Sequence, residues 1–166
     1  MKVLLITILA VGLTFTPTPR VSGEDLSSAV VGTWKITSFT RKEVTTGKSA
    51  ATFGEPPTGY AFFTKGGRFL IFATAKDRKK NEKPEPTDGE RVDLFKSMFA
   101  WGGNYKVEAS KVIYSVDIAW VPSWIGTTRT YEAQVDGNKL TITTPPFKSA
   151  QDGQDIIVVT TYERTE

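Results

Sequence analysis

The chain has 166 residues, enough for one domain with its own hydrophobic core, and a formal net charge of +3 at neutral pH. It contains no cysteine and no histidine. This composition excludes disulfides, Ser-His triads, histidine acid–base chemistry and the usual zinc sites. We therefore expect neither a metal ion nor another cofactor.

Residues 1–23 have the pattern of a secretory signal peptide. A basic start, Met1-Lys2, precedes an apolar run over residues 3–15 that is too short to span a bilayer comfortably. Small residues at 21–23 offer a cleavage point. A retained membrane anchor is the alternative interpretation. We expect an exported domain, periplasmic or extracellular, over residues 24–166.

Removal of this segment changes the charge of the protein. Lys2 and Arg20 lie within it, so its loss lowers the net charge from +3 to +1. A nearly neutral domain gives no electrostatic reason to expect binding to nucleic acid or to anionic membranes. No later apolar run is long enough to span a bilayer, so we expect no stable membrane insertion after cleavage.

The rest of the chain has the pattern of short strands separated by turn residues. From Trp34 to Phe39 the side chains alternate, with Trp34 and Ile36 on one face and Phe39 on the other. A glycine-rich turn then joins two aromatic-rich strands into a hairpin. The predicted strands cover residues 34–39, 59–64, 68–73, 104–108, 111–120, 126–135, 139–144 and 156–164.

These strands predict an all-β fold. Short strands at regular spacing, joined mostly by hairpins, favour an eight-stranded antiparallel up-and-down barrel. An eight-stranded barrel has an interior that is either filled by side chains or holds one small ligand.

One short helix is predicted at about residues 88–100. Thr87 and Glu90 have the spacing of a capping box, and the glycines at 102–103 end the helix. Its apolar face consists of Val92, Phe95, Met98 and Phe99. We expect this face to cover one end of the barrel. A ligand gate formed by Phe95 and Phe99 is the alternative.

Two motifs at the ends of the predicted barrel resemble the signature of the calycins, the superfamily of lipocalins and fatty-acid-binding proteins. Gly32-Thr33-Trp34 opens the first strand and Tyr162-Glu163-Arg164 ends the last. The resemblance implies that Gly32, Trp34 and Arg164 close the barrel, with Arg164 covering the Trp34 ring through a cation–π contact. This role is structural and not catalytic.

Over essentially the whole mature chain, the sequence resembles the small lipocalin-like domain family of bacterial and fungal proteins. The order and spacing of several short pieces carry this resemblance. They are residues 32–39 (GTWKITSF), 57–60 (PTGY), 66–68 (GGR), 103–105 (GNY) and 122–127 (PSWIGT).

The strands around residues 111–135 carry the sharpest candidate site. Arg129 and Tyr131 share one face of their strand, and Asp117 lies on the opposite face from the set Tyr114, Val116, Ile118 and Trp120. The sequence leaves open which faces point inward. Pointing inward, Asp117 and Arg129 form a buried ion pair that orients a polar ligand group or supports acid–base chemistry. Pointing outward, they form a weak surface pair.

Aromatic residues supply the remaining candidates, because an aromatic pocket with a few polar groups suits a small apolar ligand. The predicted ligand-binding residues are Tyr60, Phe62, Phe72, Phe99, Tyr105, Tyr114, Trp120, Trp124, Arg129 and Tyr131.

Three functions are consistent with this pattern. The first is an exported barrel that binds a small, largely apolar molecule without catalysis. The second is a cofactor-free isomerase or cyclase, with Asp117 or a tyrosine such as Tyr114 as the acid or base and Arg129 holding an oxyanion. The third is a filled barrel that acts through a protein partner, which predicts no cavity and an exposed apolar patch.

Overall fold

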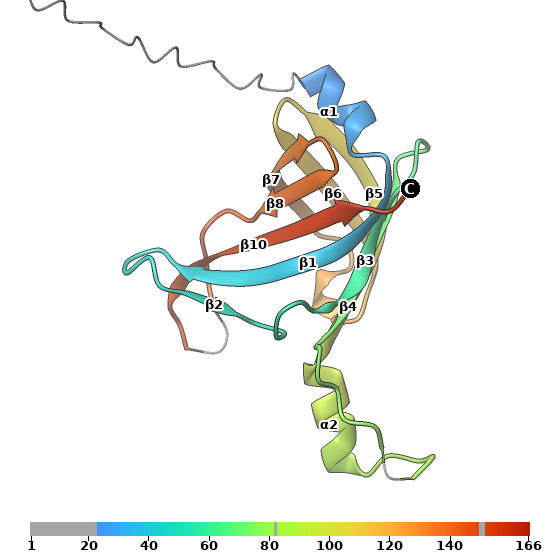
Figure 1. Cartoon of the computed structure of the whole chain (residues 1–166), viewed down its shortest axis with the longest axis vertical. Coiled ribbons are helices and arrows are strands. Elements are labelled where there is room, and N and C mark those ends of the chain that lie inside the picture. Colours follow the sequence, from blue (N-terminus) through green and yellow to red (C-terminus); the bar gives the residue numbers. More distant parts are fainter. Residues whose placement is uncertain (1–22, 82, 150–151) are drawn as a thin grey trace, which may run out of the picture.

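The computed structural model describes residues 23–81, 83–149 and 152–166, so residues 1–22 of the predicted signal peptide lie outside the described residues. The chain forms a ten-stranded antiparallel sheet that closes through the pairing of β1 with β10 (Figure 1). The strands are β1 (Gly32–Glu43), β2 (Ser49–Ala51), β3 (Thr58–Phe63), β4 (Arg68–Thr74), β5 (Met98–Glu108), β6 (Lys111–Ala119), β7 (Thr128–Asp136), β8 (Lys139–Thr143), β9 (Phe147–Lys148) and β10 (Asp155–Arg164). The helices are α1 (Gly23–Ala29), α2 (Asp88–Lys96) and the 3-10 turn η1 (Pro122–Trp124).

Eight of these strands form the barrel wall. Their order around the barrel is β1-β3-β4-β5-β6-β7-β8-β10, and β10 pairs back onto β1. The short strands β2 and β9 pair with β1 and β10 and lie outside this closed circuit. The all-β, eight-stranded up-and-down barrel predicted from the sequence is therefore confirmed.

One end of the barrel is closed by Trp34, Arg164 and the segment around α1. Trp34 is fully buried, and its indole Nε1 donates a hydrogen bond to the Val30 carbonyl at 2.8 Å. The Arg164 guanidinium carbon lies 4.1 Å from the centre of the Trp34 ring. The same guanidinium donates to the carbonyls of Val31 and Ala29. This is the arrangement that the resemblance to calycins implies, and it also holds α1, which the sequence did not predict.

The close approach of Arg164 explains the glycine at position 32. A Cβ atom on Gly32 would lie 2.6 Å from Arg164 Nη1 and 2.7 Å from the Glu166 carbonyl oxygen. The Gly32 backbone also has a φ of +140°, which residues with side chains rarely adopt. Glycine thus allows the last strand to pass directly over the start of the first.

Two bulges interrupt the alternation that the sequence predicts. In β1 the register against β10 shifts between Ile36 and Ser38, and Phe39 then packs against the core. In β6 the register against β5 shifts beside Asp117, and Ile118 becomes 60% exposed. The predicted grouping of Ile118 with the inward-facing Tyr114 is therefore wrong, as is the placement of Phe39 on the face opposite Trp34.

Helix α2 is shorter than predicted and does not cover the barrel. The capping box is present, because the Glu90 backbone N–H donates to Thr87 Oγ1 at 3.3 Å and the Thr87 N–H donates to the Glu90 carboxylate at 2.7 Å. The helix ends at Lys96, and β5 begins at Met98. Alternate β5 residues Phe99 and Trp101 are buried, which is the pattern of a strand.

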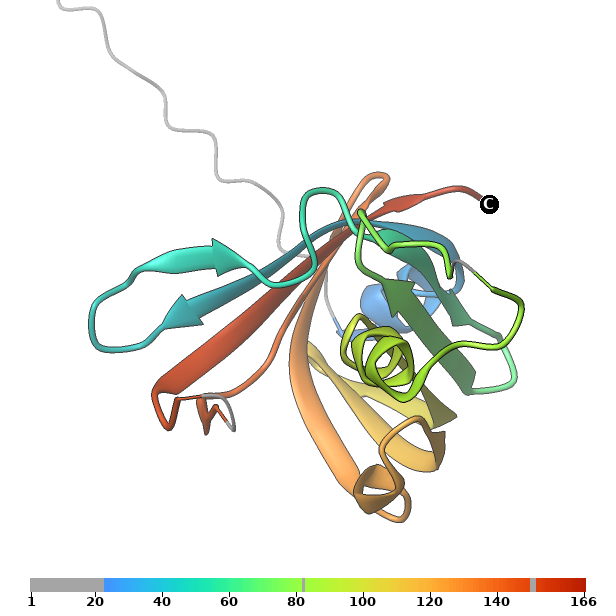
Figure 2. The ribbon, with the colours of Figure 1, turned by 90° about the horizontal axis from the view of Figure 1, so that it is seen from below.

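No side chain of α2 is buried, and the helix extends away from the strands at the end opposite α1 (Figure 1). Figure 2 views the barrel from the α2 end. Phe95 of α2 stacks on Trp120 of the barrel, with ring centres 4.0 Å apart. The prediction of a packed helical lid is therefore wrong, because the apolar residues Met98 and Phe99 belong to the barrel wall.

Candidate functional site

The barrel contains a cavity of about 660 Å³ that is partly open to solvent. This volume lies in the range of small-molecule sites, which is about 300–1,000 Å³. The lining contains ten aromatic side chains and a smaller number of threonines and aliphatic residues. The interior is therefore not filled by side chains, which contradicts the prediction of a filled barrel.

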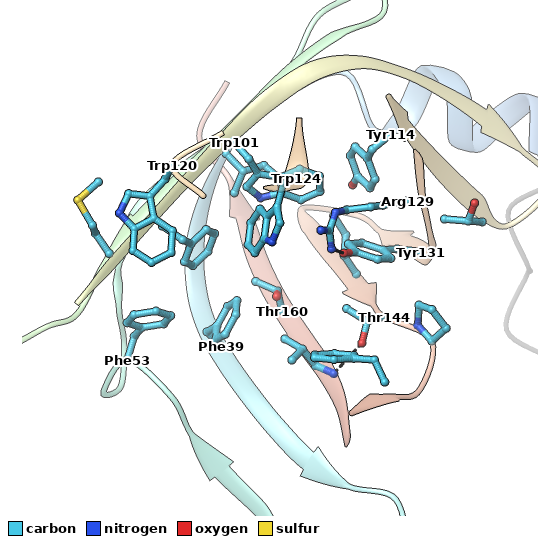
Figure 3. A pocket seen from close by; sticks show the side chains of 18 of the residues that line it. Phe39, Phe53, Trp101, Tyr114, Trp120, Trp124, Arg129, Tyr131, Thr144 and Thr160 are labelled. Atoms are coloured by element: carbon cyan, nitrogen blue, oxygen red, sulfur yellow. Dashed lines mark hydrogen bonds between the residues drawn. The ribbon is translucent and has the colours of Figure 1, made fainter. Parts of the chain in front are cut away.

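Six of the predicted ligand-binding residues line this cavity: Phe99, Tyr114, Trp120, Trp124, Arg129 and Tyr131. Figure 3 shows five of them with labels, and Phe39 and Phe53 on the side of the cavity away from Arg129. The six residues come from strands β5, β6 and β7 and from the segment between β6 and β7, which contains Trp120 and the turn η1.

Tyr60, Phe62 and Phe72 lie outside the cavity, so their prediction as ligand-binding residues is wrong. Their side chains are 40%, 39% and 42% exposed on the outer surface of β3 and β4. The inner face of this hairpin is filled by Ala61, Phe63, Phe69 and Ile71. Because both faces of the hairpin are apolar, the sequence did not show which face was inward.

The outward residues form an apolar surface that we call the outer strip, consisting of Tyr60, Phe62, Leu70, Phe72 and Ile118. Pairing places Tyr60 opposite Phe72 and Phe62 opposite Leu70. The third hypothesis predicted an exposed apolar patch, and the outer strip is such a patch, although the barrel beneath it is hollow.

Tyr105 is also outside the cavity. Its ring packs edge-on against Phe63 at 5.1 Å, and its hydroxyl donates a hydrogen bond to the Thr64 carbonyl at 2.9 Å. Partial burial raises the pKa of Tyr105 above its usual value. The residue supports the β3–β4 turn rather than contacting a ligand in the cavity.

Asp117 lies on the outer surface and does not pair with Arg129. Its carboxylate binds Arg68 instead, with Arg68 Nη2 3.2 Å from Asp117 Oδ1. The hydrogen bond from Arg68 holds the pKa of Asp117 below its usual range. The predicted use of Asp117 as an acid or base inside the barrel is therefore wrong, because Asp117 lies on the exposed face of β6, opposite the face of the buried Tyr114 and Val116.

Arg129 lines the cavity and lies opposite Tyr114 in the register of β6 and β7. Its guanidinium carbon is 4.5 Å from the centre of the Trp124 ring, and its Nη1 donates to the Tyr131 hydroxyl at 3.5 Å. The Nε atom is buried without a hydrogen-bond partner. Among the described residues, no carboxylate forms an ion pair with Arg129.

Tyr114 places a second unpaired polar group beside this cation. The side chain is 0% exposed, surrounded by Phe69, Trp101 and Tyr131 at ring distances of 4.7, 5.0 and 5.6 Å. Its hydroxyl has no hydrogen-bond partner within the described part of the chain. Burial raises the pKa of Tyr114 well above its usual value, so the hydroxyl stays neutral at physiological pH.

The charged residues of the lining are all cationic. They are Lys96, Arg129 and Lys148, and no aspartate or glutamate lines the cavity. Both lysines are exposed, and Lys148 also pairs with Asp155 at 3.1 Å. Arg129 is the charged group that lies among the aromatic rings.

Sequence reasoning missed several lining residues. Phe39, Phe53 and Phe99 form a cluster with ring centres 5.2–5.5 Å apart, and Trp101 packs edge-on against Trp124 at 6.1 Å. Phe39 was hidden by the bulge in β1 and Phe53 by its position in a Gly/Pro-rich loop. Trp101 follows directly on the predicted helix and was not assigned to a strand, although its alternation with Phe99 is a usable signal.

Within the described residues, no group of three or more acidic side chains is placed to hold a metal ion. No helix in the described part of the chain is long and apolar enough to cross a membrane.

The fold and the cavity define a small antiparallel barrel of the ligand-binding type. The chain belongs to the family of the lipocalin-like domain, whose family model matches residues 31–165. This match confirms the family predicted from the sequence. No curated protein matches the chain.

Proposed function

We propose that the protein binds one small, largely apolar molecule inside the barrel. The observation that carries this proposal is the aromatic cavity of about 660 Å³. Burial of apolar ligand surface against such a lining is favourable by roughly 25 cal/mol per Å², so an aromatic site supplies affinity without many polar contacts. Membership of the lipocalin-like family supports the same function.

The isomerase or cyclase alternative has weaker support. Asp117 is on the outer surface, and no carboxylate lines the cavity. Tyr114 and Arg129 remain as polar groups, and both suit binding as well as chemistry. A binding function explains the aromatic lining and these two polar residues without a catalytic role for either.

We also propose that the domain acts outside the cytoplasm, on the strength of the signal-peptide pattern in residues 1–23. N-terminal sequencing of the protein recovered from its own cells tests this proposal. A start near Glu24 is the expected result, and a chain that keeps Met1-Lys2 in the cytoplasmic fraction contradicts it.

Binding can be tested with a neutral apolar fluorophore, N-phenyl-1-naphthylamine, which brightens in an apolar site. We expect saturable binding of one fluorophore per protein. The variant Thr160→Phe fills part of the cavity, because Thr160 is buried and lines it (Figure 3). It should weaken binding about tenfold or more, since bulk placed in a binding cavity displaces the ligand or forces strain.

The matched control is Leu70→Gln on the outer strip, which should leave binding of the fluorophore unchanged. Thermal unfolding shows that each variant is folded before binding is compared. Binding that survives Thr160→Phe and disappears in Leu70→Gln contradicts the proposal, because the fluorophore then occupies the outer strip.

A further inference from the structure

The cavity contains a positive charge without a counter-charge. The Arg129 guanidinium is partly buried among aromatic rings, its Nε has no hydrogen-bond partner, and no described carboxylate pairs with it. Other arginines of the barrel are paired: Arg68 binds Asp117, and Arg164 binds two carbonyls. Unlike these two arginines, Arg129 keeps a buried donor, its Nε, without a hydrogen-bond partner among the described residues.

An incompletely paired charge in an apolar environment is unfavourable in the free protein. Removing a guanidinium from water costs free energy unless a counter-charge and hydrogen bonds replace the lost hydration. Trp124 and Tyr131 replace only part of it, through one ring face and one hydroxyl at 3.5 Å. Local violations of this kind are typical of functional sites, where the missing partner arrives with a ligand.

The other polar and charged groups around the cavity suit an anionic ligand. Tyr114 lies opposite Arg129 and keeps a neutral hydroxyl without a partner, which is available as a hydrogen-bond donor. The absence of aspartate and glutamate from the lining leaves no repulsive group for an anion. The exposed Lys96 and Lys148 add positive potential to the lining, which raises the local concentration of anions.

We propose that the ligand is an amphipathic carboxylate, with an apolar body and one anionic group that lies against Arg129. This inference rests on the proposed binding function and names the class of ligand. Arginine suits a carboxylate because its planar guanidinium donates two parallel hydrogen bonds. The apolar body extends across the cavity toward Phe39 and Phe53 (Figure 3).

Matched pairs of acid and amide test the inference. The probes are 2-naphthoate with 2-naphthamide and decanoate with decanamide, titrated by calorimetry at pH 7.5, where both acids are ionised. Each amide preserves the shape of its acid and removes the charge. We expect the wild-type protein to bind each acid about tenfold or more tightly than its amide, as charge-assisted hydrogen bonds predict.

Arg129→Met keeps an apolar side chain of similar length and removes the cation. We expect this variant to lose the preference for the acid while its affinity for the amide stays within about threefold of wild type. The controls are Lys35→Met and Lys106→Met, which remove exposed cations outside the cavity lining. Both should keep the preference, and in 0.5 M NaCl the wild-type preference should persist, because a partly buried charge pair is screened less than an exposed pair.

The outcomes separate this inference from the proposed function. If neither acid nor amide binds to folded wild-type protein, the binding function itself fails. If the amides bind and the acids have no advantage, only the inference on the ligand class fails. A preference that survives Arg129→Met, or that disappears in a lysine variant, also overturns it. Should Arg129→Met not fold, Arg129→Gln gives the same comparison.

Discussion

Arg129 and Tyr114 lie opposite each other on β7 and β6, and each has a buried polar atom, the Arg129 Nε and the Tyr114 hydroxyl, that no described residue pairs with. Two unsatisfied polar groups side by side in an otherwise apolar lining are unfavourable for the free protein. Both residues also line the cavity. The Arg129–Tyr114 pair therefore affects both the stability of the free protein and the binding of a ligand, and these two effects can be measured separately.

Tyr114→Phe should not destabilise the free protein. The change removes a buried hydroxyl that forms no hydrogen bond, so the free energy of unfolding should stay level or rise by up to about 1 kcal/mol. Urea denaturation at pH 7 measures this change. The control is Tyr105→Phe, which removes the hydrogen bond to the Thr64 carbonyl and should lower the free energy of unfolding by about 1 kcal/mol. A larger loss for Tyr114→Phe than for Tyr105→Phe would show that the Tyr114 hydroxyl has a partner.

Alkaline pH should destabilise the protein through its buried tyrosines. Burial raises the pKa of Tyr114 and of Tyr162 above the value of about 10 that tyrosine has in an unfolded chain. Above that value the unfolded state releases protons that the folded state keeps, so the stability is complete below pH 10 and falls as the pH rises. Each such tyrosine contributes a slope of about 1.4 kcal/mol per pH unit.

Denaturation curves recorded between pH 9 and 11 measure this slope. Tyr114→Phe should reduce the slope by the share of one tyrosine. Parallel curves for the variant and the wild type would contradict the assignment of Tyr114 as a tyrosine that stays neutral in the folded barrel.

Arg164→Met should destabilise the closed end of the barrel. The change leaves the carbonyls of Val31 and Ala29 without their donor and removes the cation from the Trp34 ring. These contributions predict a loss of about 2–4 kcal/mol in the free energy of unfolding. Arg68→Met, which breaks the exposed pair with Asp117, should have a much smaller effect. Equal losses in the two variants would contradict a special role for Arg164.

Two glycine-to-alanine changes should have opposite signs. A Cβ on Gly103 would lie 2.0 Å from the Ser115 carbonyl oxygen, so Gly103→Ala should lower the free energy of unfolding by about 3 kcal/mol or more. A Cβ on Gly89 in α2 meets no atom within 4 Å, so Gly89→Ala should raise it by about 0.5–1 kcal/mol. Thermal and urea unfolding measure both, and a stable Gly103→Ala protein would show that β5 and β6 separate easily at the bulge.

Much of the fold could be predicted from the sequence. The turn residues and the capping box of Thr87 are local signals, and the alternation around Trp34 is a periodic one. Each can be recognised without the rest of the chain. The register of the barrel and the position of α2 depend on packing between distant segments. Met98 and Phe99 fit the spacing of a helix and of a strand equally well, and only their contacts with the barrel decided between the two.

The candidate site was harder to predict than the fold. A bulge moves a side chain from one face to the other, and the bulges in β1 and β6 reversed the expected positions of Phe39 and Ile118. The apolar character of both faces of β3 and β4 hid the fact that Tyr60 and Phe72 point outward. Arg129 lines the cavity, but the predicted ion pair between Arg129 and Asp117 does not form, because Asp117 pairs with Arg68, which is far from it in the sequence.

The measurement that tests the central claim most directly is a crystal structure of the protein with bound 2-naphthoate. We predict that the naphthalene ring lies inside the barrel and that the carboxylate is within hydrogen-bond distance of the Arg129 guanidinium. A naphthoate bound on the outer strip, or one held by Lys148 with its carboxylate away from Arg129, would contradict the account.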